Sequence, residues 1–99
     1  MPQKLITATV AQGPVPLAST LTNYRTLRVI ACKGLAGPTV SPNAGRVNIG
    51  NSANASEQPF DLTPGMERSF DAAVGKMEDL QKWFLTVQTD GDGVVIVYS

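Results

Sequence analysis

The chain has 99 residues, of which 42% are hydrophobic and 16% are charged, and eight Lys and Arg balance eight Asp and Glu. A chain of this length makes one domain, 1–99, with one modest core, so a second domain is excluded. The balanced charge offers no basic surface to nucleic acid or to an anionic membrane, and we expect neither as a partner. The low charged share predicts a neutral surface that favours association.

The sequence has no apolar run of the roughly 20 residues that a membrane span requires, and its first residues lack the apolar core of a signal peptide. We therefore expect synthesis in a cytoplasm. The single cysteine, Cys32, cannot form an internal disulfide and is interpreted as a buried core residue. Stability must then come from packing or from partner subunits.

The first twenty residues are predicted to be extended. Apolar and polar residues alternate over 4–11, as in a strand with one buried face. Gln12-Gly13-Pro14 predicts a turn, and Pro16 restricts the following segment to an edge strand or an extended arm, because proline donates no backbone hydrogen bond. Residues 1–20 are therefore predicted to form an N-terminal strand or an arm that lies along a neighbouring subunit or shell.

Short strands are predicted at several later stretches, which are 25–32, 45–50, 59–62 and 66–73. Their predicted inward side chains include Leu27, Val29, Ala31, Val47 and Ile49. Between the last two stretches, Thr63-Pro64-Gly65 predicts a type II turn, because proline and glycine stand at its two central positions. The glycine- and proline-rich segment 34–44 and the polar segment 51–58 are predicted to be surface loops.

The last twenty residues predict a β-hairpin, with strands at 83–88 and 94–98 joined by Asp90-Gly91-Asp92-Gly93. Because 94–97 is apolar on both faces, this strand is either central in a two-layer core or covered by another subunit. The apolar spacing from Phe70 to Phe84 also allows one or two helical turns at 76–82. The expected fold is all-β: a compact antiparallel β-sandwich or jelly-roll barrel of about seven to eight short strands, with at most one short helical turn.

No catalytic, cofactor or metal site is predicted. The chain contains no histidine, which excludes Ser-His and Cys-His nucleophile pairs and zinc sites that use histidine. Asp90-Gly91-Asp92-Gly93 is similar to the start of a calcium loop, but the bidentate Glu at its twelfth position is missing, so we interpret it as a turn. Trp83 and Phe84 could stack on a sugar ring, although a core or interface anchor is the commoner role. We expect no enzyme.

Four segments of the chain resemble a pattern found in small structural proteins of tailed bacteriophages. They are 44–51, 62–71, 79–84 and 90–94, in the order of a "gxVyvG" strand, an "l-pGesv-fd" turn and strand, a "dLs-iyv" strand and a "gdgv" hairpin. The resemblance extends over 25–98. It implies a β-sandwich or jelly-roll protein of the virion, of the capsid decoration (cement) type.

This resemblance implies that the chain is made in the host cytoplasm and binds the major capsid protein on the capsid surface as a homo-oligomer. A trimer is expected, since decoration proteins often occupy threefold sites. The candidate interface residues are Leu5, Ile6, Val10, Val15, Leu17, Trp83, Val95 and Val97. The alternative is a tail or head-fibre module that binds a host-surface glycan through the loops at 34–44 and 51–58. Burial of Trp83 and contacts to a capsid shell would favour the first role, and an exposed Trp or Tyr at the end of the sandwich, near those loops, would favour the second.

Overall fold

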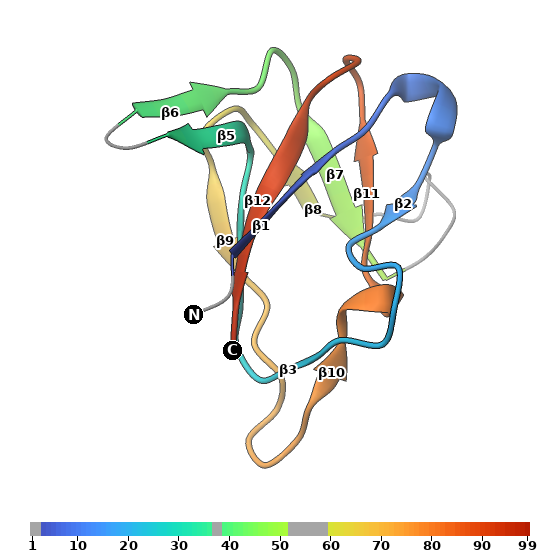
Figure 1. The fold of residues 1–99 in the computed structure, drawn as a ribbon, viewed down its shortest axis with the longest axis vertical. Coiled ribbons are helices and arrows are strands. Elements are labelled where there is room, and N and C mark those ends of the chain that lie inside the picture. Colours follow the sequence, from blue (N-terminus) through green and yellow to red (C-terminus); the bar gives the residue numbers. More distant parts are fainter. Residues whose placement is uncertain (1–2, 37–38, 52–59) are drawn as a thin grey trace.

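A computed structural model describes residues 3–36, 39–51 and 60–99, which form a compact, antiparallel, nearly all-β structure (Figure 1). Two four-stranded sheets supply the two layers of a sandwich-like fold. Sheet A has the order β1 (Gln3–Thr7), β12 (Gly93–Tyr98), β4 (Leu27–Ile30), β9 (Glu67–Ser69). Sheet B has the order β2 (Val15–Pro16), β11 (Phe84–Val87), β7 (Val47–Gly50), β8 (Phe60–Leu62). The predicted fold class is confirmed.

Two smaller ribbons and two short 3-10 turns complete the described chain. The ribbons pair β5 (Cys32–Ala36) with β6 (Thr39–Pro42) and β3 (Asn23–Tyr24) with β10 (Glu78–Asp79). The turns are η1 (Val10–Gln12) and η3 (Leu80–Lys82). The turn η3 lies within the predicted helical range 76–82. The strand predicted over 4–11 is shorter than expected: β1 ends at Thr7, and η1 begins at Val10.

Much of the segment 34–44, predicted to be a loop, belongs to the β5–β6 ribbon. The prediction failed because a ribbon of this kind is held by backbone hydrogen bonds, which do not depend on the apolar alternation that marks a half-buried strand. The other predicted loop, 51–58, lies outside the described residues except for Asn51.

The predicted C-terminal hairpin is wrong. β11 pairs with β2 and β7, whereas β12 pairs with β1 and β4, so the two strands belong to different sheets. The segment between them takes the chain from sheet B to sheet A, and β12 does not return beside β11. Its Asp-Gly residues do mark a change of direction, but the identity of the pairing partner depends on contacts distant in sequence.

The core lies between the two sheets and follows the predicted alternation. The inward residues Leu27, Val29, Ala31, Val47 and Ile49 are all buried. β12 is an inner strand of sheet A, with Val94 and Ile96 in the core. Val95 and Val97 therefore point to the opposite face, and β5 lies close to β12. The first of the two interpretations of this strand, a central strand of a two-layer core, is the one observed.

The described part of the N-terminal segment forms strands of the chain's own sheets. β1 pairs with β12 along its whole length, and Val15 of β2 pairs with Leu85 of β11. Of the two forms predicted for residues 1–20, the strand is observed for the described residues and the arm reaching away from the chain is not. Pro16 lies on an edge strand, as its missing N–H requires.

Candidate functional site

Three of the eight candidate interface residues are buried inside the chain. Leu17 is 0% exposed, Val95 is 2% exposed and Ile6 is 8% exposed. Ile6 and Leu17 belong to the main core. A chain of this size has a modest core, and its first twenty residues also contribute to it. These three side chains are therefore removed from the set that a partner could contact directly.

The other five candidates retain exposed surface but do not lie together. Leu5 is 49% exposed on β1, and Val10 is 53% exposed in η1. Val15, Trp83 and Val97 are half-buried, and the first two of these pack against the core. The sequence-derived set therefore divides between several surfaces.

Sheet A has a row of apolar side chains on the face turned away from the core. Leu5, Val95 and Ile30 are directly opposite one another on β1, β12 and β4. They share this face because their sequence neighbours Ile6, Val94 and Val29 are in the core, and successive side chains of a strand alternate. Leu5 is exposed and Ile30 is half-buried. We call this surface, with the adjacent Val97, the outer face of sheet A.

Ile30 was missed by the sequence analysis, although the sequence carries a signal for it. Leu27, Val29 and Ala31 were assigned to the inward face of their strand, which leaves Ile30 as an apolar side chain on the outward face. An antiparallel strand with one solvated face normally carries a polar residue there. Because Ile30 departs from this alternation, the strand carries apolar side chains on both faces of the sheet.

Charged side chains border the outer face at the edge of β9. The guanidinium Nε of Arg28 lies 3.0 Å from Glu67 Oε1, and both side chains are about half exposed. An exposed ion pair of this kind contributes about 0–1 kcal/mol to stability. Its more useful role is to define a polar rim beside the apolar row.

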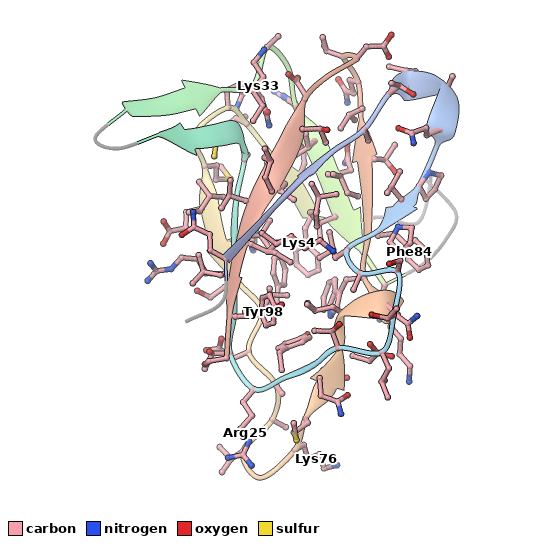
Figure 2. The ribbon with its side chains drawn as sticks, viewed as in Figure 1. Lys4, Arg25, Lys33, Lys76, Phe84 and Tyr98 are labelled. Carbon is pink, nitrogen blue, oxygen red and sulfur yellow. The ribbon has the colours of Figure 1, made fainter. Side chains whose placement is uncertain are left out.

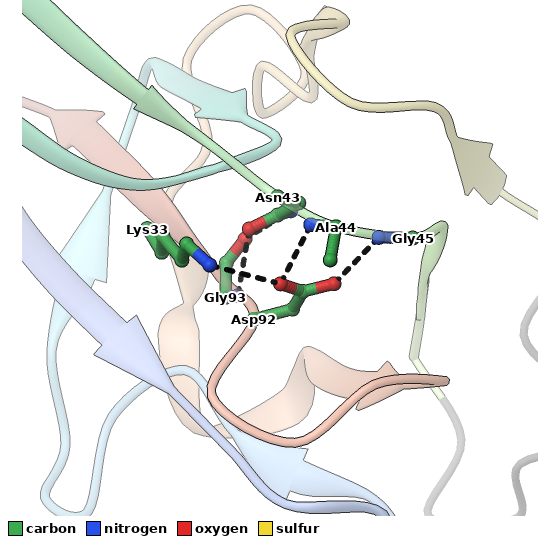
Figure 3. A network of polar contacts seen from close by, with 6 residues as sticks. All are labelled: Lys33, Asn43, Ala44, Gly45, Asp92 and Gly93. Carbon is green, nitrogen blue, oxygen red and sulfur yellow. Dashed lines mark hydrogen bonds and ion pairs between the residues drawn. The ribbon is translucent and has the colours of Figure 1, made fainter.

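A buried polar network joins the β11–β12 crossing to the segment between β6 and β7 (Figure 3). The carboxylate of Asp92, which is 0% exposed, accepts hydrogen bonds from the backbone N–H of Ala44 at 2.9 Å and of Gly45 at 2.8 Å. The ammonium of Lys33 lies 4.0 Å from the same carboxylate. Because a buried carboxylate needs such partners, this network has a structural role.

Asn43 extends the network with two hydrogen bonds to one glycine. Its side-chain Nδ2 donates to the carbonyl oxygen of Gly93 at 2.8 Å, and its Oδ1 accepts from the Gly93 N–H at 3.1 Å. The Asn43 side chain therefore bonds both backbone groups of Gly93, the first residue of β12, as a neighbouring strand would. Within 3–36, 39–51 and 60–99, no group of three or more His, Cys, Asp or Glu side chains is placed to hold a metal ion.

A pocket of about 290 Å³ lies beside the β3–β10 ribbon. Figure 2 marks this end of the molecule by Arg25 and Lys76, with Lys33 near the other end. The lining residues come from four separate stretches of the chain: Tyr24, Asn51, Phe70, Asp71, Glu78, Lys82 and Trp83. Apart from the note on Trp83, sequence reasoning missed this site, because only the fold brings these stretches together.

The apolar wall of the pocket is a rigid aromatic cluster. The rings of Phe70 and Trp83 have centroids 4.9 Å apart, and Phe60 lies edge-on to Phe70 at 4.8 Å. Trp83 Nε1 donates a hydrogen bond to the hydroxyl oxygen of Tyr24 at 2.7 Å. Desolvation by burial raises the pKa of Tyr24, while the bond from Trp83 acts in the opposite direction and is the smaller influence. Tyr24 is therefore a neutral phenol at physiological pH.

The polar wall of the pocket combines both signs of charge. Asp71 and Glu78 are exposed carboxylates, and Lys82 is an exposed ammonium. Asp71 Oδ1 accepts the backbone N–H of Leu27 at 3.1 Å, which fixes its orientation and leaves its second oxygen for another donor. The pocket thus offers stacking on one side and hydrogen bonds on the other.

Comparison of the chain with protein-family models, with curated proteins and with solved structures finds no match. Across the described ranges, none of the helical turns is long and apolar enough to span a bilayer. Function must therefore be argued from the two surfaces above and from the sequence motifs.

Proposed function

We propose that the chain is a structural protein of a tailed-phage virion, a capsid decoration (cement) protein that binds the major capsid shell as an oligomer and stabilises it. The proposal is supported by the motif resemblance over 25–98 together with the all-β sandwich-like fold. The single observation that carries it is the apolar outer face of sheet A. Two of the candidate interface residues that keep exposed surface, Leu5 and Val97, share this face, and the buried Val95 lies between them on the same side of the sheet.

The exposed part of the outer face is available for burial against another protein. Fully burying one aliphatic side chain contributes about 1.5–3 kcal/mol, and Leu5 still has 49% of its surface exposed. Ile30 and Val97 add smaller shares because they are already half-buried. Such a surface provides modest adhesion per subunit, which the several copies of an oligomer multiply on a repetitive shell.

The two edges of sheet A differ in a way that favours β1 as the adhesive edge. β9 carries Glu67 and Arg68, and charges on an edge strand oppose pairing with another chain. β1 has Lys4 as its one charged residue, and Leu5 next to it is exposed. A partner strand could therefore add to β1 while its side chains cover the outer face. In this proposal the partner is the major capsid protein or a neighbouring copy within a trimer.

The test replaces Leu5 with lysine and uses Leu21→Lys as the matched control. Leu21 is 69% exposed and lies before β3, so the same substitution changes surface charge without touching sheet A. The readouts are co-sedimentation with capsids that lack the decoration protein and the mass in solution. We expect Leu5→Lys to lose capsid binding and to shift the mass toward the 10.5 kDa monomer, with Leu21→Lys unaffected.

Two results would contradict the proposal at different levels. Decoration by Leu5→Lys at the level of the unmodified chain would show that the outer face of sheet A is not the adhesive surface. Failure of the unmodified chain to bind capsids under any condition would remove the virion role itself.

The second candidate function is the tail or head-fibre module that binds a host-surface glycan. Of the two loops predicted to do this, much of 34–44 belongs to the β5–β6 ribbon, and Asn51 is the one residue of 51–58 that the structure describes. Asn51 lines the pocket beside the β3–β10 ribbon, and this pocket favours ligand binding.

A further inference from the structure

We infer that the pocket of about 290 Å³ beside the β3–β10 ribbon is a binding site for one neutral sugar ring. This site shares no residue with the outer face of sheet A, so it adds a second binding function to the decoration role. Its volume lies near the lower limit of ligand pockets, which run from about 300 to 1,000 Å³. One ring fits this volume, and a longer saccharide would extend out of it.

The aromatic wall supplies the platform on which such a ring can pack. The C–H groups of a sugar form an apolar face that aromatic side chains bury well. Trp83 is half-buried, so part of its indole stays open. The indole is fixed by its hydrogen bond to Tyr24 and by the Phe70 ring at 4.9 Å. A platform that is already ordered loses little conformational entropy when the ligand binds.

The hydroxyl of Tyr24 has one proton left to donate at the pocket wall, where the Tyr24 side chain as a whole is only 1% exposed. Its hydroxyl oxygen already accepts from Trp83, which leaves its own proton to donate. Within the described ranges no acceptor for that proton is found. Because the phenol is neutral, this donor is present throughout the physiological pH range.

The polar wall matches the hydroxyl groups of a sugar. Asp71 and Glu78 accept hydrogen bonds, whereas Lys82 and the amide of Asn51 donate them. A hydroxyl both donates and accepts, so neighbouring hydroxyls of one ring can use both kinds of partner.

The same wall affects charged ligands in different ways. Its two carboxylates, Asp71 and Glu78, outnumber the one ammonium, Lys82, so an anion is repelled overall, and Lys82 offsets part of the attraction that a cation would meet. An aromatic site with carboxylates alone would suit a quaternary ammonium ion. The presence of Lys82 at the rim directs the choice to an uncharged, hydroxyl-rich ring.

Trp83 makes the inference directly measurable, because it is the chain's single tryptophan. Its fluorescence and its Nε1–H resonance therefore report on the pocket without interference. The full chain is titrated with glucose, galactose, mannose and N-acetylglucosamine, each singly. We expect at least one sugar to give a saturable change, with a Kd of about 1 mM or tighter.

A variant pair tests whether the polar wall takes part. Glu78→Gln keeps the size of the side chain and removes a charged acceptor, so the Kd should rise about tenfold. Asp61→Asn is the matched control, because Asp61 is an exposed carboxylate paired with Arg46 and does not line the pocket. Its Kd should equal that of the unmodified chain, and circular dichroism verifies that both variants fold.

Three outcomes would overturn the inference. The first is the absence of a saturable change with all four sugars. The second is equal sugar affinity for the unmodified chain, Glu78→Gln and Lys82→Met, which would mean that the polar wall does not recognise the ligand. The third is saturation by tetramethylammonium or sulfate without saturation by any sugar, which would identify the pocket as a site for a charged group.

Discussion

Asp92 ties the crossing between β11 and β12 to the segment just before β7. Its carboxylate accepts hydrogen bonds from the backbone N–H groups of Ala44 and Gly45. A hydrogen bond to a charged group contributes about 1.5–3 kcal/mol, and leaving a buried carboxylate unpaired costs more. The position of Asp92 in the chain was available from the sequence, but partners more than forty residues away were not.

Tyr24 gives the chain a predicted pH dependence. Its pKa is raised above the ordinary value of 10.0, first by burial, and further by the nearby Glu78 and Asp71. The folded state therefore holds the phenol proton more tightly than the unfolded state does. The stabilisation is fully present below pH 10 and is lost as the pH rises through the folded pKa. We expect the free energy of unfolding to fall steadily in this alkaline range.

Chemical denaturation at a series of pH values from neutral to alkaline measures this dependence. Tyr24→Phe is the control: it should be less stable at neutral pH, because Trp83 Nε1 loses its acceptor, but its stability should change less with pH above 10. Parallel curves for the two proteins would show that Tyr24 does not titrate differently in the folded and unfolded states.

At the scale of elements, local patterns predicted strands and turns well and their partners poorly. The turn at 63–66 is confirmed in detail: Met66 N–H bonds to Thr63 C=O at 2.9 Å, and Gly65 has a φ of +84°. Those features depend only on neighbouring residues. Strand pairing depends instead on which faces become buried, so the same alternation that located β11 and β12 did not reveal that they lie in different sheets.

The approach of β1 to β12 gives an element-scale prediction. A Cβ added at Gly93 would overlap the carbonyl oxygen of Ile6 and lie 2.8 Å from Thr7 Cα. Backbone atoms cannot move aside as a flexible side chain can, so Gly93→Ala must separate the two strands. We expect a loss of about 3 kcal/mol in the free energy of unfolding, measured by denaturant titration.

Gly91→Ala provides the comparison for this prediction. Gly91 is in the same crossing, and an added Cβ there meets no atom within 4 Å, but its φ of +88° is unfavourable for alanine. That substitution should cost about 1–2 kcal/mol through backbone conformation alone. A loss at Gly93 no larger than the loss at Gly91 would show that the strands can separate at little cost.

At the scale of the whole molecule, the size of the chain decides which predicted interface residues stay available. A domain of 99 residues has a modest core to which its first twenty residues also contribute, and Ile6 and Leu17 are used there, whereas Leu5 and Val10 stay exposed. The candidate surface could be predicted in part, because Leu5, Val95 and Val97 lie on one face. The pocket could not, since its lining residues are spread from Tyr24 to Trp83 and only the tertiary fold assembles them.

The two surfaces should act independently, because they share no side chain. Leu5 is on the outer face of sheet A, and Glu78 lines the pocket beside β3 and β10. Changes at sites without common partners are usually additive to within about 0.5 kcal/mol. We therefore expect Leu5→Lys to keep the sugar affinity of the unmodified chain, and Glu78→Gln to keep its capsid binding.

The double variant Leu5→Lys/Glu78→Gln completes this test. Its sugar Kd should equal that of Glu78→Gln alone, and its capsid binding should equal that of Leu5→Lys alone. Saturating sugar should likewise leave capsid co-sedimentation of the unmodified chain unchanged, because a ligand alters a second equilibrium only when its affinity differs between the two states. A sugar-dependent change in capsid binding would contradict this independence and would show that the pocket and the outer face of sheet A are two coupled sites.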